Sequence, residues 1–399
     1  MKSNKKIILL ILGLLSAIGP FSIDMYLPAF DTIAKDFNTN IENVQLSLTS
    51  FFIGIAIGQM IYGPLLDKYG RKKPLIIGLI IYVVASILCV LTNSVENLIL
   101  LRFIQALGSC AGMVAGRAMV QDYYQGTEAA RVFSLLMLVI AISPILAPTA
   151  GAFLLENFDW HYIFIALFAI GLIILVLTIY LLPESYSGNK QYSLAPKAIT
   201  KQYFQVFTHQ TFIFYCLIAS TAAAGLYAYL AGSSYILQEL YGLSKKEYGI
   251  AFAFVASALI MSTQLNRVFL KRWSMQQICM VANIGQVIVG VLMLVSLWTN
   301  IINLPIIIGL IFGYLLFQGF IFPNASAMAM APFKVSAGSA SALLGFLQMG
   351  LGAVSSALVS LFHNNTPQPM LMIMCLCGVI SLVLHIVKRN LKQKEEVYL

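Results

Sequence analysis

Charged residues are scarce in this chain of 399 residues. Only 10% of the residues are Asp, Glu, Lys or Arg, whereas 60% are apolar and the mean hydropathy is +0.87. A soluble domain needs about 25% charged residues to cover its core with a polar surface. This chain has too few, and the scarcity excludes a soluble globular protein.

The sequence also lacks the short motifs of common catalytic sites. It contains no H-E-x-x-H zinc motif, no G-x-S-x-G nucleophile motif and no G-x-x-x-x-G-K-(S/T) phosphate loop. Without a nucleotide site, any work that the protein performs must draw on an ion gradient. We therefore expect no enzyme activity, no cofactor and no metal ion.

Cysteine is scarce too, and its positions exclude a disulfide framework. All six cysteines fall within apolar stretches, with the spacing of neither a zinc site nor loop disulfides. We interpret them as small apolar side chains packed between helices: Cys89, Cys110, Cys216, Cys279, Cys375 and Cys377.

Long apolar blocks, in contrast, recur along the whole chain. About 20 apolar residues cross a bilayer core that is about 30 Å thick as a helix, whereas membrane strands show short alternating segments. The first block has no A-x-A-like cleavage site, so we expect a retained helix. The sequence predicts an all-α membrane protein with twelve transmembrane helices at 7–28, 43–66, 74–92, 98–119, 131–155, 161–182, 211–236, 248–268, 276–297, 304–325, 338–361 and 370–388.

The net charge is +9, and the basic residues are distributed as the predicted topology requires. With a cytoplasmic N-terminus, nearly all Lys and Arg residues outside the spans lie on the cytoplasmic side. Only Lys35, Lys245 and Lys246 lie on the opposite side. This asymmetry is the positive-inside rule, and it predicts that both termini are cytoplasmic. The basic charge is explained by topology, so we expect no nucleic-acid partner.

One connection is much longer than the others and divides the chain. The polar, turn-rich segment 183–210 separates six predicted spans from six more. Two six-helix bundles joined by a cytoplasmic linker are the plan of many secondary transporters. The sequence predicts an N-terminal bundle over 1–182 and a C-terminal bundle over 211–399.

The predicted loop between the second and third spans carries an extended motif. It reads GPLLDKYGRKKPL from Gly63 to Leu75. Glycine permits the close helix approach at Gly63 and the tight turn at Gly70. Asp67 ends a helix, where a carboxylate needs a balancing positive charge. We therefore predict a conformational latch formed by Gly63, Asp67, Gly70 and Arg71.

This loop resembles the signature of the major facilitator superfamily, G-x-L-x-D-(R/K)-x-G-(R/K)-(R/K)-x-x-L, at every specified position. Other segments are similar to its drug:proton antiporters of the bicyclomycin and chloramphenicol resistance (Bcr/CflA) type. They include the end of the first span with Asp24, the fourth span with Arg102, and an antiporter-like motif with Pro144, Pro148 and Gly151. That motif departs from the family pattern where alanines replace glycines, at Ala147 and Ala152, as does Ala106 in the fourth span.

The resemblance implies the major facilitator fold, two six-helix bundles, and a monomer in the inner membrane of a bacterium. It implies export of small hydrophobic, drug-like molecules in exchange for protons by alternating access. An importer of a small uncharged solute is an alternative, as is a membrane enzyme or assembly protein. The missing catalytic motifs disfavour the last of these.

Two ionisable residues inside the spans are candidates for proton coupling. Among the carboxylates, only Asp24 lies clearly within an apolar block, and such residues usually mark a pathway or relay. A rise of 1.5 Å per residue from the span ends puts Asp24 and Arg102 at nearly the same depth. We predict that they interact directly or through Gln105. The alternatives are an early helix end that leaves Asp24 at the interface, and an Arg102 that extends to the membrane surface.

Other polar and aromatic residues are candidates for the transport path. Arg117 either acts as a gate by pairing with Asp122 or a loop carboxylate, or extends to the membrane surface. Three histidines at span ends (His209, His363 and His385) are expected at the interface. Aromatic side chains with a few polar groups predict a drug pocket formed by Phe21, Asp24, Tyr26, Gln105, Met113, Tyr227, Phe317, Phe320, Asn324 and Gln348. Tyr227 fits an interfacial belt equally well.

Overall fold

The computed structural model describes residues 5–124, 126–189, 193–333 and 337–397, and every regular element in these ranges is helical. Eleven helices among them are long and apolar enough to cross a membrane. The remaining predicted span, 131–155, falls on α6 (Gly126–Asn157). The predicted all-α class is confirmed. The other spanning helices are α1 (Lys5–Asp24) with its continuation α2 (Phe30–Asp36), α3 (Ile41–Tyr69), α4 (Lys72–Val90), α5 (Val95–Tyr123), α7 (His161–Leu181), α9 (Gln210–Ser234), α10 (Lys245–Phe269), α11 (Met275–Trp298), α12 (Leu304–Met330), α13 (Ala337–Leu361) and α14 (Gln368–Val397).

Polar side chains mark where several of these helices begin. Ser94 accepts a hydrogen bond from the backbone of Asn97 at the start of α5, and Ser274 forms a capping box with Gln277 at the start of α11. The side chain of Asn303 accepts a hydrogen bond from the backbone of Ile306 at the start of α12. Such caps satisfy backbone N–H groups that have no partner within the helix. The interior N–H groups bond within each helix, as the water-free core of a bilayer requires.

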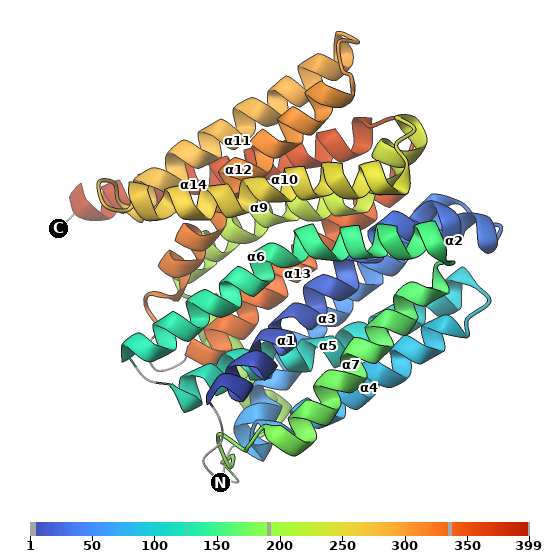
Figure 1. Cartoon of the computed structure of the whole chain (residues 1–399). Helices are drawn as coiled ribbons and strands as arrows, with labels where there is room; N and C mark the ends of the chain where they lie inside the picture. The colour runs from blue at the N-terminus through green and yellow to red at the C-terminus, as the bar shows by residue number, and fades with distance from the viewer. Residues whose placement is uncertain (1–4, 125, 190–192, 334–336, 398–399) are drawn as a thin grey trace. The chain divides into compact units, whose positions relative to one another are not determined.

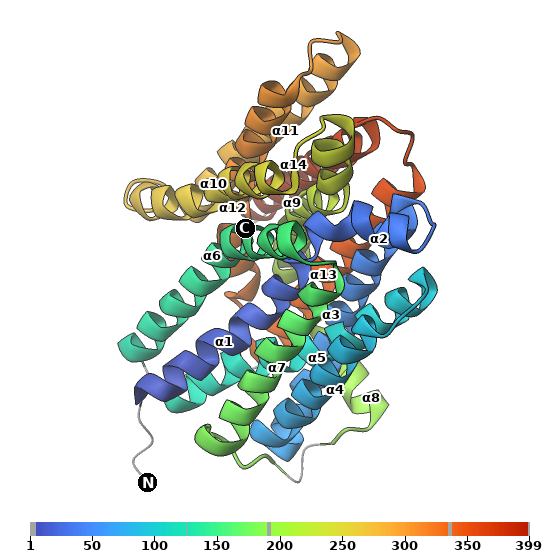
Figure 2. The ribbon, with the colours of Figure 1, turned by 45° about the vertical axis from the view of Figure 1, so that its right-hand side comes forward.

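The chain forms two compact units, one of Met1–Lys201 with Ser244–Ile250 and one of Gln202–Leu243 with Ala251–Leu399. In the first unit, α5 packs against α1, α3 and α4, and α1 also packs against α6 and α7 (Figures 1 and 2). In the second unit, α9 packs against α12, α13 and α14, while α11 packs against α12 and α14. Each unit therefore has its own core.

The first predicted span, 7–28, is interrupted in the structure. α1 ends at Asp24, and the chain continues through a 3-10 turn (Leu27–Ala29) into α2. Pro20 lies inside α1 and Pro28 lies in the turn. Because proline lacks the N–H that continues a helix, the break lies where the sequence favours it. The alternative of an early helix end is confirmed as geometry, but Asp24 remains buried, with 5% of its surface exposed.

The segment predicted as a linker also contains regular structure. A short helix, α8 (Pro196–Phe207), lies within 183–210, and it buries Tyr203 and Val206. At the end of α9 the helix widens into a π turn, Tyr235–Leu240. Neither feature was expected from the hydropathy pattern, which registers long apolar blocks and not short amphipathic or irregular turns.

Candidate functional site

The carboxylate of Asp24 is buried at the end of α1 without a partner. It forms neither a hydrogen bond nor an ion pair with any residue in the part of the chain that the structure describes. Buried charges are ordinarily paired, because leaving one alone in an apolar region is costly. An unpaired carboxyl group in a spanning segment is therefore an exceptional feature that calls for a functional explanation.

Arg102 on α5 is fully buried and is held by polar and aromatic groups. Its Nη1 donates a hydrogen bond to Oε1 of Gln105 at 2.6 Å, and its Nη2 donates to the backbone carbonyl of Ser22 at 2.7 Å. The guanidinium carbon lies 4.2 Å from the ring centroid of Phe51 and 4.7 Å from that of Tyr26. Aromatic faces attract cations, so rings and a carbonyl, rather than a carboxylate, balance this charge.

The predicted contact between Asp24 and Arg102 is not formed. Arg102 reaches α1 two residues earlier, at the Ser22 carbonyl. Gln105 does bind Arg102, but its Nε2 donates to Oγ of Ser86 on α4 at 2.7 Å rather than to Asp24. The matched depths were a sound guide to proximity, yet depth along a helix does not determine the direction of a side chain.

A buried polar network surrounds Arg102 and connects three helices. The hydroxyl groups of Ser22 and Tyr82 are 2.7 Å apart, and Oγ of Ser86 donates to the backbone carbonyl of Tyr82 at 2.7 Å. Together with the bonds of Gln105, these contacts join α1, α4 and α5. Ser22, Tyr82 and Ser86 were not among the residues predicted from the sequence. Their polar character within apolar spans was the available signal.

The other N-terminal cavity candidates differ in how accessible they are. Tyr26 is fully buried, with its hydroxyl 2.8 Å from Oγ of Ser47 and its ring against Arg102. It therefore supports Arg102 in this structure. Phe21 and Met113 are half-buried, and they retain accessible surface for a ligand.

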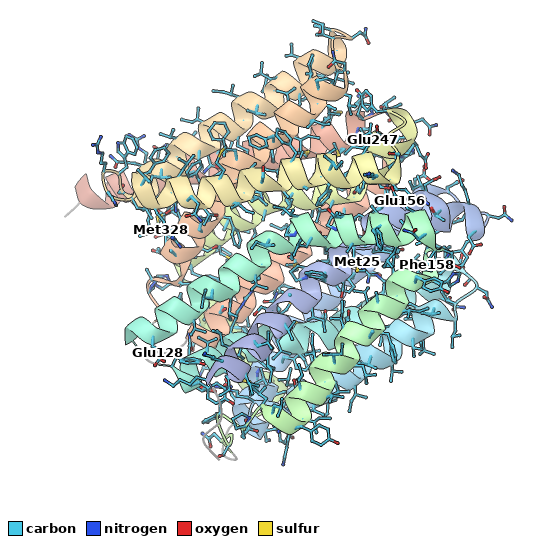
Figure 3. The ribbon with its side chains drawn as sticks, viewed as in Figure 1. Met25, Glu128, Glu156, Phe158, Glu247 and Met328 are labelled. Carbon is cyan, nitrogen blue, oxygen red and sulfur yellow. The ribbon has the colours of Figure 1, made fainter. Side chains whose placement is uncertain are left out.

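The antiporter-like motif of α6 lies beside the end of α1. Pro148 and Gly151 are buried and Pro144 is half-buried. A Cβ atom at position 151 would collide with the backbone carbonyl of Met25. Met25 is the residue after Asp24 and lies beside α6 (Figure 3). Glycine thus permits α6 to contact the backbone at the point where α1 stops.

The C-terminal candidates form two small groups in the second unit. Gln348 on α13 donates a hydrogen bond to the hydroxyl of Tyr227 on α9 at 3.5 Å. Asn324 on α12 donates to Oδ1 of Asn266 on α10 at 2.8 Å. Phe320 stacks on Phe269 with a centroid distance of 5.6 Å, and Phe317 is half-buried.

A buried histidine in this unit corrects one expectation. His385 was expected at the interface, but only 1% of its surface is exposed. Its Nδ1 lies 3.2 Å from Nδ2 of Asn283, and Oγ of Ser381 donates to Oδ1 of Asn283 at 2.6 Å. These contacts connect α11 and α14. α14 runs on to Val397, so His385 lies within the helix and not at its end.

The loop motif forms an ion-pair cluster at the ends of α3 and α5. Arg71 donates through Nη1 to Asp67 at 2.7 Å and through Nε to Asp122 at 3.0 Å. Burial by itself would lower the pKa of Arg71, but the hydrogen bonds to the two carboxylates raise it above its ordinary value. Asp122 thus pairs with Arg71. Arg117, for which pairing with Asp122 was one alternative, lies earlier on α5 and is half-buried.

The chain segment after α7 closes over this cluster. Glu184 accepts hydrogen bonds from the backbone N–H groups of Arg71 and Lys72 at 2.9 and 3.1 Å, which caps the start of α4. Oγ of Ser185 donates to Asp122 at 2.8 Å, and the ring of Tyr186 lies 4.7 Å from the guanidinium carbon of Arg71. Glu184, Ser185 and Tyr186 thus form a clamp over the loop motif. The clamp was not predicted, because its residues are remote from the motif in sequence.

Gly70 provides a test of the clamp. Its φ of +86° is unfavourable for other residues, and a Cβ atom would lie 2.7 Å from the backbone oxygen of Tyr186. We expect Gly70→Ala to slow transport by about fivefold or more, because its Cβ atom would displace the backbone of Tyr186 from Arg71 and such overpacking costs about 1–3 kcal/mol. Substrate affinity should be unchanged. Transport rates in proteoliposomes and equilibrium binding in detergent measure the two effects.

The matched control is Gly242→Ala, because Gly242 also has a positive φ, +68°, but nothing lies within 4 Å of a Cβ atom there. It carries the backbone strain without the clash. An equal effect of both substitutions would argue against a role for the clamp.

The sequence matches a known protein family. The sequence pattern of the Major Facilitator Superfamily matches residues 12–357. The chain belongs to this superfamily. It is a transporter and not an enzyme, as the sequence predicted, and the major facilitator fold is confirmed.

Several relatives cover nearly the whole chain. The MFS-type transporter YdgK of Bacillus subtilis is 34% identical over 93% of this chain and 92% of its own length. The bicyclomycin resistance protein homolog of Haemophilus influenzae is 30% identical over 97% of this chain and 98% of its own. Multidrug resistance protein D of Escherichia coli is 28% identical over 89% of both. These relatives confirm the resemblance to the bicyclomycin resistance branch.

Solved structures of the same superfamily share the fold at low sequence identity. A D-xylose-proton symporter aligns with a TM-score of 0.74 and 15% identity, covering 96% of this chain and 97% of the symporter. A nucleoside transporter aligns with a TM-score of 0.73 and 14% identity, covering 96% and 98%. At this identity the likeness concerns the fold alone.

Proposed function

We propose that this transporter exports small hydrophobic, drug-like molecules across the inner membrane of a bacterium in exchange for protons. The observation that carries the proposal is the buried, unpaired carboxyl group of Asp24 in a superfamily member with drug-resistance relatives. A proton is the simplest means of neutralising an isolated buried carboxylate. Substrate export and proton entry can then be linked through this one group.

The position of Asp24 at the end of α1 supports such a link. The C-terminal end of a helix carries partial negative charge, to which an ionised Asp24 adds. Arg102 balances part of it by binding the Ser22 carbonyl. A change in the protonation of Asp24 alters the electrostatic balance at this helix end, next to the close contact between Gly151 and Met25.

The cycle that we propose is alternating access. Protonation of Asp24 from the outer side promotes release of the substrate, and deprotonation toward the cytoplasm restores the binding state. By thermodynamic reciprocity, a substrate that binds the deprotonated form more tightly also makes proton release easier by the same factor. Arg71, Asp67 and Asp122 form the conformational latch, with Arg117 as a further candidate gate.

The topology and the pocket are part of the proposal. We propose a monomer with cytoplasmic termini, bundles over 1–182 and 211–399, and a linker over 183–210. Substrate contacts come from the half-buried candidates, which are Phe21 and Met113 in the first unit and Phe317 and Gln348 in the second.

The test is transport in proteoliposomes with and without an imposed pH gradient. Bicyclomycin and chloramphenicol are the first compounds to try, in parallel with susceptibility tests in a host that lacks its own exporters. If the protein is a proton-coupled exporter, the drug will accumulate against its own concentration gradient. This accumulation will be lost when the pH gradient is dissipated. Uptake of an uncharged solute with protons in the same direction would instead identify an importer, and no transport of any compound would reject the proposal.

A further inference from the structure

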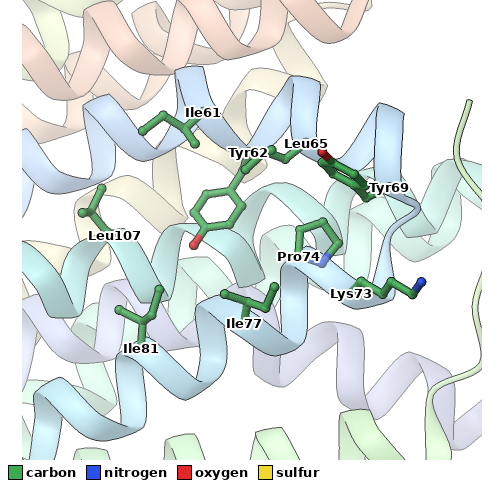
Figure 4. A pocket seen from close by; sticks show the side chains of 9 residues that line it. All are labelled: Ile61, Tyr62, Leu65, Tyr69, Lys73, Pro74, Ile77, Ile81 and Leu107. Carbon is green, nitrogen blue, oxygen red and sulfur yellow. The ribbon is translucent and has the colours of Figure 1, made fainter. Parts of the chain in front are cut away.

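A cavity of about 450 Å³ opens on the side of the first unit, between α3, α4 and α5 (Figure 4). This volume lies in the range of ligand pockets, about 300–1,000 Å³. The lining is almost entirely apolar. Its residues are Ile61, Tyr62, Leu65, Tyr69, Lys73, Pro74, Ile77, Ile81 and Leu107.

The rim of the cavity is exposed on the outer surface of the bundle. Ile61, Tyr69 and Ile77 are 46%, 51% and 59% exposed, although all are large apolar or aromatic residues. Tyr62 and Pro74 are buried and form the inner wall. Exposed apolar side chains on a membrane-spanning segment face lipid tails, so the occupant of this groove reaches it from the bilayer.

The groove has the length of one lipid leaflet. It extends from Tyr69 to Ile61 on α3 and from Lys73 to Ile81 on α4, which is about 12 Å at 1.5 Å per residue. Half of a hydrocarbon core about 30 Å thick is about 15 Å. One end lies where α3 and α4 meet at the membrane surface, and the other lies near the depth of Leu107. An acyl chain of one leaflet fits these dimensions.

Two lysines provide positive charge at the surface end. Nζ of Lys73 points away from the apolar groove toward this end in Figure 4, and Lys73 makes no ion pair with any residue that the structure describes. Nζ of Lys68 lies 5.7 Å from the ring centroid of Tyr69. The nearby carboxylate of Asp67 is already bonded to Arg71. Basic pockets between membrane helices bind anionic lipid headgroups.

We infer that this groove is a specific site for an anionic phospholipid, with an acyl chain along α3 and α4 and the phosphate between Lys68 and Lys73. The proposed topology puts the turn between α3 and α4 on the cytoplasmic side, so the lipid would belong to the cytoplasmic leaflet. No other part of the inference relies on the proposed topology. The lipid would connect the two helices whose turn carries Gly70 and Arg71. Binding of the lipid would stabilise the conformation in which this groove is open.

Native mass spectrometry of the purified full-length protein tests the site. The probes are phosphatidylglycerol and phosphatidylcholine with identical acyl chains. We expect at least about fivefold stronger retention of phosphatidylglycerol, and a loss of about fivefold per lysine in Lys73→Gln and Lys68→Gln, since one lysine near an anionic membrane surface contributes about that factor. The control is Lys271→Gln, because Lys271 is an exposed lysine of the second unit; it should leave retention unchanged.

A second pair of variants tests the apolar groove. Ile77→Trp should fill it and reduce retention of phosphatidylglycerol. Leu88→Trp, at an exposed position of α4 outside the groove, should not. Equal retention of both lipids, or equal effects of the groove and control variants, would overturn the inference. So would displacement of phosphatidylglycerol by bicyclomycin or chloramphenicol, which would make the groove a drug site. Because binding is measured without transport, the result is independent of the proposed function.

Discussion

Asp24→Asn is expected to abolish proton-coupled drug export to the level of cells without the protein. The substitution keeps the shape of the side chain but removes the group that exchanges a proton. Asp24 has no hydrogen-bond or ion-pair partner among the described residues. The apparent melting temperature of the Asp24→Asn variant should therefore stay within about 2 °C of the native value. Drug susceptibility and pH-driven efflux in proteoliposomes measure the first effect, and thermal unfolding in detergent measures the second.

Asp24→Glu is the matched control, because it keeps a carboxyl group at a slightly shifted position, and partial coupling should survive. Gradient-driven efflux by the Asn variant at the native rate would show that another group carries the proton. A large loss of stability would mean that Asp24 has a structural partner.

Arg102→Ala is expected both to abolish transport and to destabilise the protein. The Ser22 carbonyl and Gln105 would lose their partner in a buried region, and each unsatisfied group costs about 1–3 kcal/mol. Arg102→Lys keeps the charge, but the planar fork that reaches both acceptors is lost, so partial stability and little transport are expected. Tyr82→Phe removes the contact between the hydroxyl groups of Tyr82 and Ser22 but keeps both bonds of Arg102, so it should have a smaller effect.

The combination of Asp24→Asn with Arg102→Lys tests whether the two groups meet during the cycle. In this structure they do not interact, so their effects on stability should add to within about 0.5 kcal/mol. If the two residues pair in another conformation, their effects on the transport rate will not add. Additivity in both measurements would mean that Arg102 only holds the end of α1.

Much of the fold could be predicted because the bilayer restricts what a chain can do. A spanning segment must be helical and apolar over about 20 residues, so the pattern of apolar blocks predicted the helices. The superfamily was indicated by the resemblance of the loop motif from Gly63 to Leu75 to the family signature. The break after Asp24 was open to prediction as well, because Pro20 and Pro28 flank it. α8 and the π turn after α9 escaped the prediction, since short elements leave little trace in hydropathy.

The candidate site was predicted less completely, because the direction of each side chain depends on its neighbours. The sequence singled out Asp24 and Arg102 as ionisable residues in apolar spans. It also predicted a latch at Asp67 and Arg71, and the structure brings these two residues into contact. It paired Asp24 with Arg102 because the two residues have nearly the same estimated depth. For Arg117 it left open a pair with Asp122 or a loop carboxylate, and an extension to the membrane surface.

The sequence by itself determined the class of protein, since composition and periodicity act locally and the membrane permits few alternatives. It also determined which residues are ionisable within the spans. Only the tertiary structure decided which groups meet. Arg102 binds the Ser22 carbonyl because α1 and α5 pack closely there, and Asp122 binds Arg71 because α5 ends beside the turn between α3 and α4. These two contacts join residues 80 and 51 positions apart in sequence, and packing rather than local pattern determines them.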